Sequence, residues 1–228
     1  MVFDVLIALS CVSMVASGLL ALRQNDQKRL LAYSSIGQMG YILLGIGVGT
    51  PLAVLGGIFH LMNHAVMKSL MFLTSGAVEY ATGTRDLDKM GGLRKRMPVT
   101  AWASLVGSLS ISGVPPFCGF WSKLVIIVAC VQAGRYGCAA AAVVGSLLTL
   151  SSFMKVQKYA FFGDLRPEHE NVREVPATMR WAMILLAALC IVMGGLLVPQ
   201  IRGVVLDPAV DVIRNGTAYG AAVFARGQ

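Results

Sequence analysis

Six long apolar segments constrain the fold of this chain more than any other feature. A helix of about 20 mostly apolar residues is long enough to cross a bilayer. Because backbone polar groups find no water there, only helices and closed barrels cross it, and runs this long lack the alternating pattern of a barrel. The sequence therefore predicts an all-α integral membrane protein with six transmembrane helices. The expected spans are about 2–22, 30–49, 52–80, 99–131, 138–162 and 181–199.

Composition agrees with a membrane protein. Hydrophobic residues make up 56% of the 228 residues and charged residues only 13%, whereas soluble domains carry about 25% charged residues. The five cysteines are scattered and odd in number, and they form no C-x-x-C pair. They therefore indicate neither a disulfide framework nor a metal site. We expect this chain to hold no cofactor, no metal and no catalytic residue of its own.

Basic residues are distributed unequally between the two sides of the predicted membrane domain. Thirteen lie in or beside the first, third and fifth connections, and four lie on the opposite side. The positive-inside rule places the thirteen in the cytoplasm, so both termini would face outward from the inner (cytoplasmic) membrane. The net charge of +8 needs no nucleic acid to explain it, since no base-stacking motif accompanies it. The thirteen are Arg23, Lys28, Arg29, Arg85, Lys89, Arg94, Lys95, Arg96, Lys155, Lys158, Arg166, Arg173 and Arg180.

The six spans form one predicted domain, residues 1–200, followed by a tail. The first span begins Met-Val-Phe-Asp, without the basic start and cleavage site of a secretory signal, so we expect it to be retained. The tail, residues 201–228, is weakly apolar and contains Pro208. It fits either a surface helix or irregular chain.

Lys68 and Lys123 are the two basic residues that lie deep inside apolar segments. A charge at the bilayer centre costs about 2.5–3.5 kcal/mol on insertion scales and more in simulations. A chain that keeps two such charges, beside two histidines and a broken helix, is expected to move protons or other ions.

Lys68 belongs to a polar row in the third segment. His60, His64 and Lys68 are spaced by four residues, which places them on one helical face about a turn apart. Histidine titrates at about pH 6.5 and can pass protons in the physiological range. One interpretation is a hydrated proton relay, and the other is a set of hydrogen bonds between helices. The pairing of His64 with Lys68 favours the relay, whereas His60 alone fits both.

Lys123 follows a break in the fourth segment. Residues 112–119 read Ser-Gly-Val-Pro-Pro-Phe-Cys-Gly, and Pro115 and Pro116 should unwind the helix there. Unwound backbone at membrane depth is tolerated only against protein or a water-filled cavity. Lys123 then lies just inside the second half-helix, near backbone groups and a helix dipole that bind ions. The alternative is a lysine that snorkels to the interface, which the apolar residues after it disfavour.

Polar residues also occur in and near the second span. Ser34, Ser35 and Gln38 fit either a water path or small contacts between helices. We add Gln38 to the candidate path, together with Lys28 just before the span. Two other lysines, at 155 and 158 near the end of the fifth span, are expected to snorkel.

Acidic residues are missing from the interior of every predicted span. All eleven lie near segment ends or in connections. A lysine-based ion path without an internal counter-charge is incomplete. We therefore expect the partner charges to lie on another polypeptide.

Several runs, taken together and in this order, resemble a known family. The second and third segments contain Gln-Lys-Arg-Leu-Leu-Ala-Tyr-Ser-Ser-Ile-Gly-Gln-Met-Gly-Tyr and His-Ala-Val-Met-Lys-Ser-Leu-Met-Phe-Leu, and the fourth contains Gly-Val-Pro-Pro-Phe-Cys-Gly-Phe-Trp-Ser-Lys. The chain resembles the antiporter-like proton-pumping subunits of respiratory complex I, membrane hydrogenases and Mrp-type sodium/proton antiporters. The runs lie at 24–41, 64–73, 85–93, 113–123 and 160–163.

The resemblance implies positions for the candidate residues. Family members have about fourteen transmembrane helices, including two inverted five-helix repeats, and this chain resembles the second repeat plus the last helix. His64 then matches the histidine of the eleventh helix, and Lys123 matches the ionisable residue of the broken twelfth. Gln38 stands where some members carry a tenth-helix histidine, so a proton would pass it only through water.

These expectations lead to one prediction and three alternatives. The prediction is a proton- or Na⁺/H⁺-translocating subunit of a redox-driven or antiporter complex, which supplies the half-channel from the central axis to the outside. Lys123 would be the terminal proton site, with His64 and Lys68 along the axis. Its partners would be other membrane subunits, including a chain that carries the first repeat. The alternatives are a non-pumping structural subunit that docks neighbours, an antiporter subunit with no redox enzyme, and a truncated or misread gene.

Overall fold

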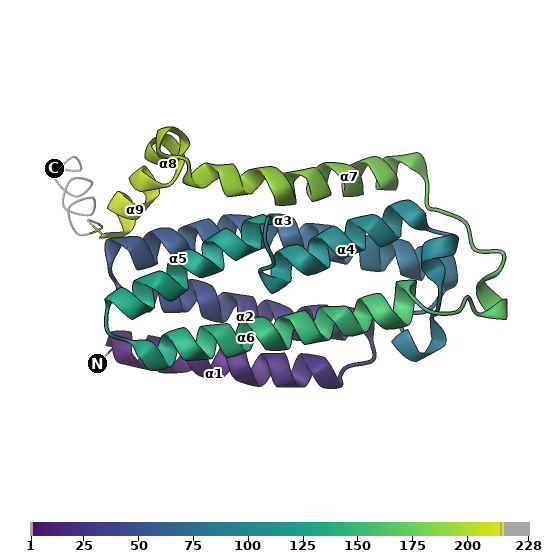
Figure 1. Ribbon diagram of the computed structural model, residues 1–228, viewed down its shortest axis with the longest axis horizontal. Coiled ribbons are helices and arrows are strands. Elements are labelled where there is room, and N and C mark those ends of the chain that lie inside the picture. Colours follow the sequence, from purple (N-terminus) through teal and green to yellow (C-terminus); the bar gives the residue numbers. More distant parts are fainter. Residues whose placement is uncertain (1, 215, 217–228) are drawn as a thin grey trace, which may run out of the picture.

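Helices make up nearly all of the computed structural model, which describes residues 2–214 and residue 216. Within those residues no β-strand forms, and seven helices of at least 15 residues lie roughly side by side (Figure 1). Two short helices, α8 (Pro199–Val205) and α9 (Asp207–Arg214), follow them. The seven are α1 (Val2–Arg23), α2 (Gln27–Val48), α3 (Pro51–Thr82), α4 (Pro98–Ser112), α5 (Cys118–Gln132), α6 (Tyr136–Val156) and α7 (Ala177–Val192).

Local sequence signals explain where the first helices begin and end. The Asp26 carboxylate caps α2 by accepting a hydrogen bond of 2.9 Å from the backbone N–H of Arg29. Thr50 caps α3 in the same way, and Pro51 occupies the first helical position, where its missing N–H costs nothing. Gly49 ends α2 in the left-handed conformation that glycine adopts without strain.

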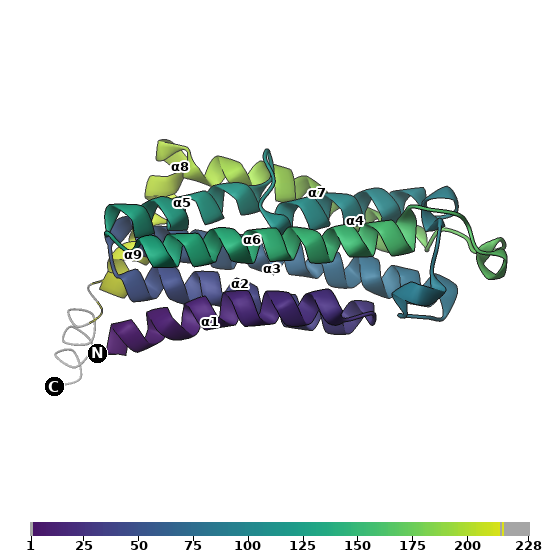
Figure 2. The same cartoon turned by 60° about the horizontal axis from the view of Figure 1, so that its bottom comes forward.

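α3 is the central helix of the bundle. It packs against α2, α4, α5 and α7, while α1 packs against α2 and α6 (Figure 2). Small residues let α2 and α3 approach closely, because a Cβ on Gly45 would lie 2.6 Å from the Ala53 carbonyl oxygen. α3 has 32 residues and is roughly 48 Å long at the helical rise of 1.5 Å per residue.

The helices differ in some bounds from the predicted spans. The predicted fourth span, 99–131, is two helices, α4 and α5, separated by five residues. α6 continues through a π-helical turn, Gln157–Phe161, and α7 begins at Ala177 and continues through a 3₁₀ turn, Met193–Leu197. The tail is helical up to Arg214, and its remainder, apart from residue 216, lies outside the described residues.

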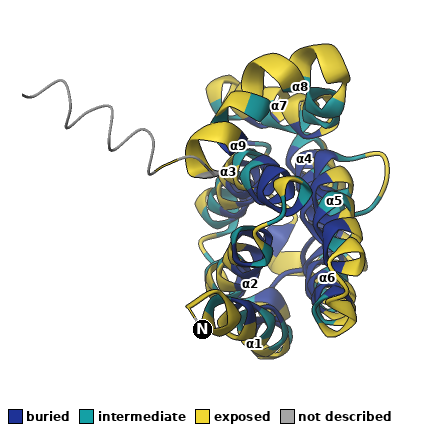
Figure 3. Ribbon diagram, turned by 90° about the vertical axis from the view of Figure 1, so that its left-hand side faces the viewer, coloured by how far each residue is buried: buried dark blue, intermediate teal, exposed yellow. Residues whose placement is uncertain are grey.

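Four helices of the described chain are long and apolar enough to cross a membrane individually, and they begin at Val2, Gln27, Tyr136 and Ala177. They differ in how far the protein encloses them. In the most apolar stretch of α2, 56% of the residues are buried, but only 11% are buried in that of α7. Figure 3 shows α7 and α8 as a mostly exposed layer on one side of the bundle. The described part of the chain is therefore an all-helical bundle with an open apolar flank.

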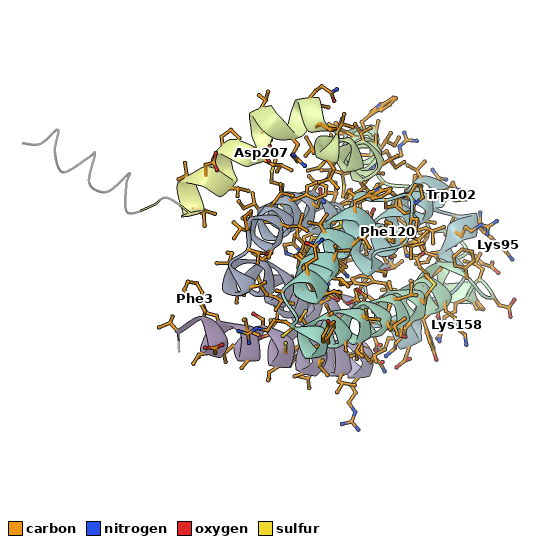
Figure 4. All side chains as sticks on the ribbon, turned by 60° about the vertical axis from the view of Figure 1, so that its left-hand side comes forward. Phe3, Lys95, Trp102, Phe120, Lys158 and Asp207 are labelled. Atoms are coloured by element: carbon orange, nitrogen blue, oxygen red, sulfur yellow. The ribbon has the colours of Figure 1, made fainter. Side chains whose placement is uncertain are left out.

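The connections that carry the thirteen basic residues lie at one end of the molecule. α1, α3 and α6 all finish at this end, which we call the basic end (Figure 1). Lys95 and Lys158 mark it in Figure 4, whereas Phe3 and Asp207 lie toward the opposite end. The alternating direction of the helices thus collects the basic connections on one side.

Candidate functional site

The interruption between α4 and α5 is the structural centre of the site. α4 ends at Ser112, and Gly113 follows with a φ of 82°, which favours glycine. The peptide bond between Pro115 and Pro116 is cis. In an unbroken helix the Ile111 carbonyl would accept a hydrogen bond from residue 115, but proline has no N–H. This carbonyl oxygen is therefore left for another donor.

Lys123, on α5, supplies that donor. Its Nζ lies 2.8 Å from the Ile111 carbonyl oxygen, and the residue is 2% exposed. The same Nζ lies 4.6 Å from the centre of the Tyr41 ring, within the range of a cation–π interaction. Lys123 also lines a surface groove of about 190 Å³ between α5 and α6, together with Phe120, which Figure 4 labels. The helix break thus holds a buried amine between a carbonyl and an aromatic ring.

Close packing at the break depends on Gly119. A Cβ at this position would lie 1.9 Å from the Ser110 carbonyl oxygen, so the first turn of α5 crosses the end of α4 directly. Glycine is therefore required for the two half-helices to meet where Lys123 can reach Ile111.

His60, on α3, connects that helix to α2 and α5 beside the same Tyr41 ring. Its Nδ1 lies 2.8 Å from the Ser122 hydroxyl on α5, and its Nε2 lies 3.1 Å from the Gln38 side-chain oxygen on α2. Its ring centre is 5.4 Å from that of Tyr41, whose hydroxyl donates to the Ala142 carbonyl on α6. Both ring nitrogens of His60 are therefore occupied by hydrogen bonds between helices.

His64 lies one turn further along α3 and is less constrained. Its ring centre is 6.5 Å from that of His60, and its Nδ1 is buried without a hydrogen-bond partner among the described residues. The same is true of Nε2 of Gln38 and of Oδ1 of Asn63, whose amide nitrogen donates to Cys118 at 3.1 Å. Buried polar atoms of this kind are where ordered water binds in proteins.

Lys68 ends the polar row of α3 toward the basic end. Its Nζ donates to the Leu31 carbonyl oxygen at 2.7 Å and to the Ser34 hydroxyl, both on α2. The residue is 7% exposed, and its amine also lies 5.9 Å from the Phe153 ring centre. The structure therefore brings Lys68, His64, His60, Gln38 and Lys123 into one buried region formed by α2, α3 and α5.

Lys28 is the predicted candidate that lies outside this buried region. Its Nζ forms an ion pair of 2.5 Å with Glu79 at the basic end, where the two side chains are 39% and 34% exposed. Lys155, which we expect to snorkel, also lies near this end. Its Nζ donates to the carbonyl oxygens of Leu22 and Gln24, at 3.1 and 3.0 Å, and so caps the end of α1.

Sequence reasoning missed two residues of the site. Tyr41 lies under Lys123, and its spacing from Ser34 and Gln38, four residues and then three, would have placed it on their helical face. Ser122 carries no sequence signal beyond its position beside Lys123. The buried region contains no acidic side chain, as the sequence predicted. All eleven acidic residues lie in the described part of the chain, and none of them is buried.

Solved structures with this fold are membrane complexes. One chain in the structure of the Mrp complex from Dietzia sp. matches with a TM-score of 0.89 and 27% identity, over 97% of this chain and 49% of that one. One chain in respiratory complex I from Thermus thermophilus matches with a TM-score of 0.83 and 25% identity, over 93% of this chain and 44% of that one.

Curated relatives are similar in sequence over most of this chain. It is 37% identical to a Na(+)/H(+) antiporter subunit of Alkalihalophilus pseudofirmus, over 84% of this chain and 40% of the relative. It is 41% identical to hydrogenase-4 component B of Escherichia coli, over 82% of this chain and 31% of the relative. It is 37% identical to an NADH-quinone oxidoreductase subunit of Desulforudis audaxviator, over 79% of this chain and 40% of the relative. The chain thus spans two-fifths or less of the length of these relatives.

The family model described as "NADH:quinone oxidoreductase/Mrp antiporter, TM" matches residues 2–149, which include α1 to α5 and most of α6. The matched region contains the buried lysines, both histidines of α3 and the helix break. The chain therefore belongs to the NADH:quinone oxidoreductase/Mrp antiporter transmembrane family.

Proposed function

We propose that this chain is a proton- or Na⁺/H⁺-translocating membrane subunit that supplies one half-channel of a multisubunit complex. The observation that carries the proposal is the buried row of Lys68, His64, His60 and Lys123, which crosses from α3 to the broken helix. Burying ionisable side chains is costly, and inside membrane proteins such groups mark ion pathways. The relatives include subunits of antiporter, hydrogenase and NADH-quinone oxidoreductase complexes.

In this proposal protons move along the row through side chains and water. The ring centres of His60 and His64 are 6.5 Å apart, and both nitrogens of His60 bond to other helices, so a proton passes between the two rings when one of these hydrogen bonds is exchanged for one to water. The unpartnered atoms of His64, Gln38 and Asn63 are positioned to hold such waters. Gln38 cannot titrate, but its amide can donate to and accept from water. Lys123 is the terminal site, because the helix break offers its amine an acceptor that needs no charge.

The proposal includes a membrane arrangement. The six spans are α1, α2, α3, the α4–α5 pair, α6 and α7, and they correspond to the second five-helix repeat and the last helix of the family. The chain lies in the inner membrane, and its basic end faces the cytoplasm. The opposite end, where the described N-terminus lies, then faces outward.

Counter-charges for the two lysines come from polypeptide outside these 228 residues. The eleven acidic residues of the described chain are all at least partly exposed and lie near helix ends or in connections. The groove beside Lys123 gives an external carboxylate a way to approach it. We propose that a chain carrying the first repeat supplies this charge, and that any driving redox reaction takes place in a further subunit.

The test is ion transport by the assembled complex in inverted membrane vesicles, measured with a pH-sensitive dye. Lys123→Ala and His64→Ala should both abolish or strongly reduce the pH gradient, while complex assembly is retained. Lys158→Ala, at an exposed lysine of the basic end, is the control. Wild-type transport by both site variants would overturn the proposal.

The second candidate function is a structural subunit that docks neighbouring subunits and moves no ions. Two observations favour it: both nitrogens of His60 are occupied by other helices, and the amine of Lys68 is held by α2. If this function is correct, substitutions on the exposed face of α7 would disrupt assembly of the complex. Complexes that contain the Lys68 or Lys123 variants would transport ions normally, because the transport takes place in other subunits.

A further inference from the structure

A second line of polar side chains approaches Lys123, and the pathway proposed above does not use it. Thr100, Ser104 and Ser108 recur every four residues along α4, so their hydroxyls lie on one helical face. All three residues are 0% exposed. The line runs from the basic end, where α4 begins, toward the helix break, where α4 stops.

Gln157 connects the middle of this line. It is the first residue of the π-helical turn after α6, a distortion that often occurs at functional sites. Its amide nitrogen donates to the Ser104 hydroxyl at 2.9 Å and to the Ser108 hydroxyl at 2.8 Å. Its side-chain oxygen is buried and has no hydrogen-bond partner in the part of the chain that the structure describes. An amide oxygen in that position needs a donor, and water is the donor available to it.

The two ends of the line have different chemistry. At the basic end the Glu174 carboxylate accepts from the Thr100 hydroxyl at 2.6 Å and from the Val99 N–H at 2.8 Å, and it is partly exposed. At the inner end the Ser112 hydroxyl donates to the Ser108 carbonyl at 2.6 Å. The carbonyl oxygen of Ile111, the residue before Ser112, accepts a hydrogen bond from Nζ of Lys123.

We infer that Thr100, Ser104, Ser108 and Gln157 line a proton-conducting water route from Glu174 at the basic end to Lys123. This inference rests on the proposed function, because it assigns Lys123 a second approach in addition to the histidine row. Hydroxyl and amide groups both donate and accept, so they order water and exchange hydrogen bonds without titrating. Glu174 is the carboxylate at the outer end of this line. Ser108 accepts from Gln157, and its own hydroxyl hydrogen faces only the weak acceptor Sδ of Met71 at 4.0 Å, so it is available to water.

The sharpest test compares side chains of equal volume at Ser108. Ser108→Thr keeps the hydroxyl, whereas Ser108→Val replaces it with a methyl group of the same shape. We expect the valine variant of the assembled complex to transport protons roughly tenfold more slowly than the threonine variant, a difference of about 1.4 kcal/mol in the barrier. Equal rates in the two variants would overturn the route, since any packing effect is shared by both.

A matched pair at Ser152 controls for burial alone. Ser152 on α6 is also 0% exposed, and its hydroxyl donates within its own helix to Leu148 at 2.9 Å. Ser152→Thr and Ser152→Val should transport at equal rates, and a similar loss in the valine variant here would count against the route. Gln157→Leu and Gln157→Glu extend the test, with faster transport expected for the glutamate variant.

Lys123→Ala, measured in parallel, separates the two proposals. If it loses transport while the Ser108 pair is equal, the route is wrong and the proposed function stands. If it transports normally, the proposed function falls and the route falls with it. Loss in Lys123→Ala together with a faster threonine variant supports both.

Discussion

α3 and α7 are both long helices of this bundle, yet the more polar one is enclosed and the more apolar one is open. His60 on α3 is 0% exposed and Lys68 is 7% exposed. On α7, Trp181 is 70% exposed and Leu185 is 63% exposed. In a soluble protein the apolar helix would be expected inside.

The surrounding lipid accounts for the inversion. Lipid chains are as apolar as leucine, so α7 gains little by leaving them, whereas the ionisable groups of α3 are costly in lipid and must face protein or water. The helix for which contact with lipid is most costly therefore takes the centre, and its neighbours supply hydrogen bonds rather than apolar contacts. Substitutions on either side of this contrast should have different consequences.

The largest effect is expected from a methyl group at the helix break. Gly119→Ala places a Cβ 1.9 Å from a backbone carbonyl that cannot rotate away. The loss of folding stability should exceed the usual range of about 1–3 kcal/mol for overpacking. It should appear as a smaller yield of folded protein in detergent. Gly195→Ala, just after α7, is the control, because a Cβ there would meet nothing within 4 Å beyond the neighbouring backbone. Equal thermal stability of the two variants would show that the break is not tightly packed.

A lysine on α7 tests the lipid side of the comparison. Leu185→Lys places a charge at an exposed position well inside that helix and should reduce membrane insertion by about 2.5–3.5 kcal/mol. Leu185→Ala should have a much smaller effect. The measurement is the fraction of helix inserted in a translocation assay with a glycosylation site on each side. Normal insertion of the lysine variant would mean that protein or water, rather than lipid, covers α7.

The two histidines of α3 should respond differently. His60→Ala leaves the Gln38 oxygen without its partner, and a buried unsatisfied group costs about 1–3 kcal/mol, whereas the Ser122 hydroxyl keeps the Gly119 carbonyl as an acceptor. His64→Ala removes a ring whose Nδ1 has no partner among the described residues, so stability should fall less. Unfolding in mixed micelles measures this, and vesicle transport measures the relay separately. A larger stability loss for His64 would contradict the contact pattern.

The sequence predicted those features that depend on local order along the chain. The lengths of the apolar runs located the helices, two adjacent prolines located the break, and the four-residue spacing placed His60, His64 and Lys68 on one face. Contacts between distant segments were beyond its reach. His60 meets Ser122 across 62 residues, and only the packed helices show that they touch. The π-helical turn that aims Gln157 at α4 has no signal in the residue types.

Lys155 provides the smallest and most discriminating test of such tertiary contacts. Lys155→Met keeps the length of the side chain but removes the donor that caps the α1 carbonyls, and cations at helix C-termini contribute about 0.3–1 kcal/mol. Lys158→Met, three residues on at an exposed position, should change stability by less. If both variants unfold alike, Lys155 behaves as a snorkelling residue. If only Lys155→Met is weakened, a lysine near the end of an apolar segment cannot be assigned to the interface from sequence alone, because the carbonyls of a neighbouring helix compete with water for its amine.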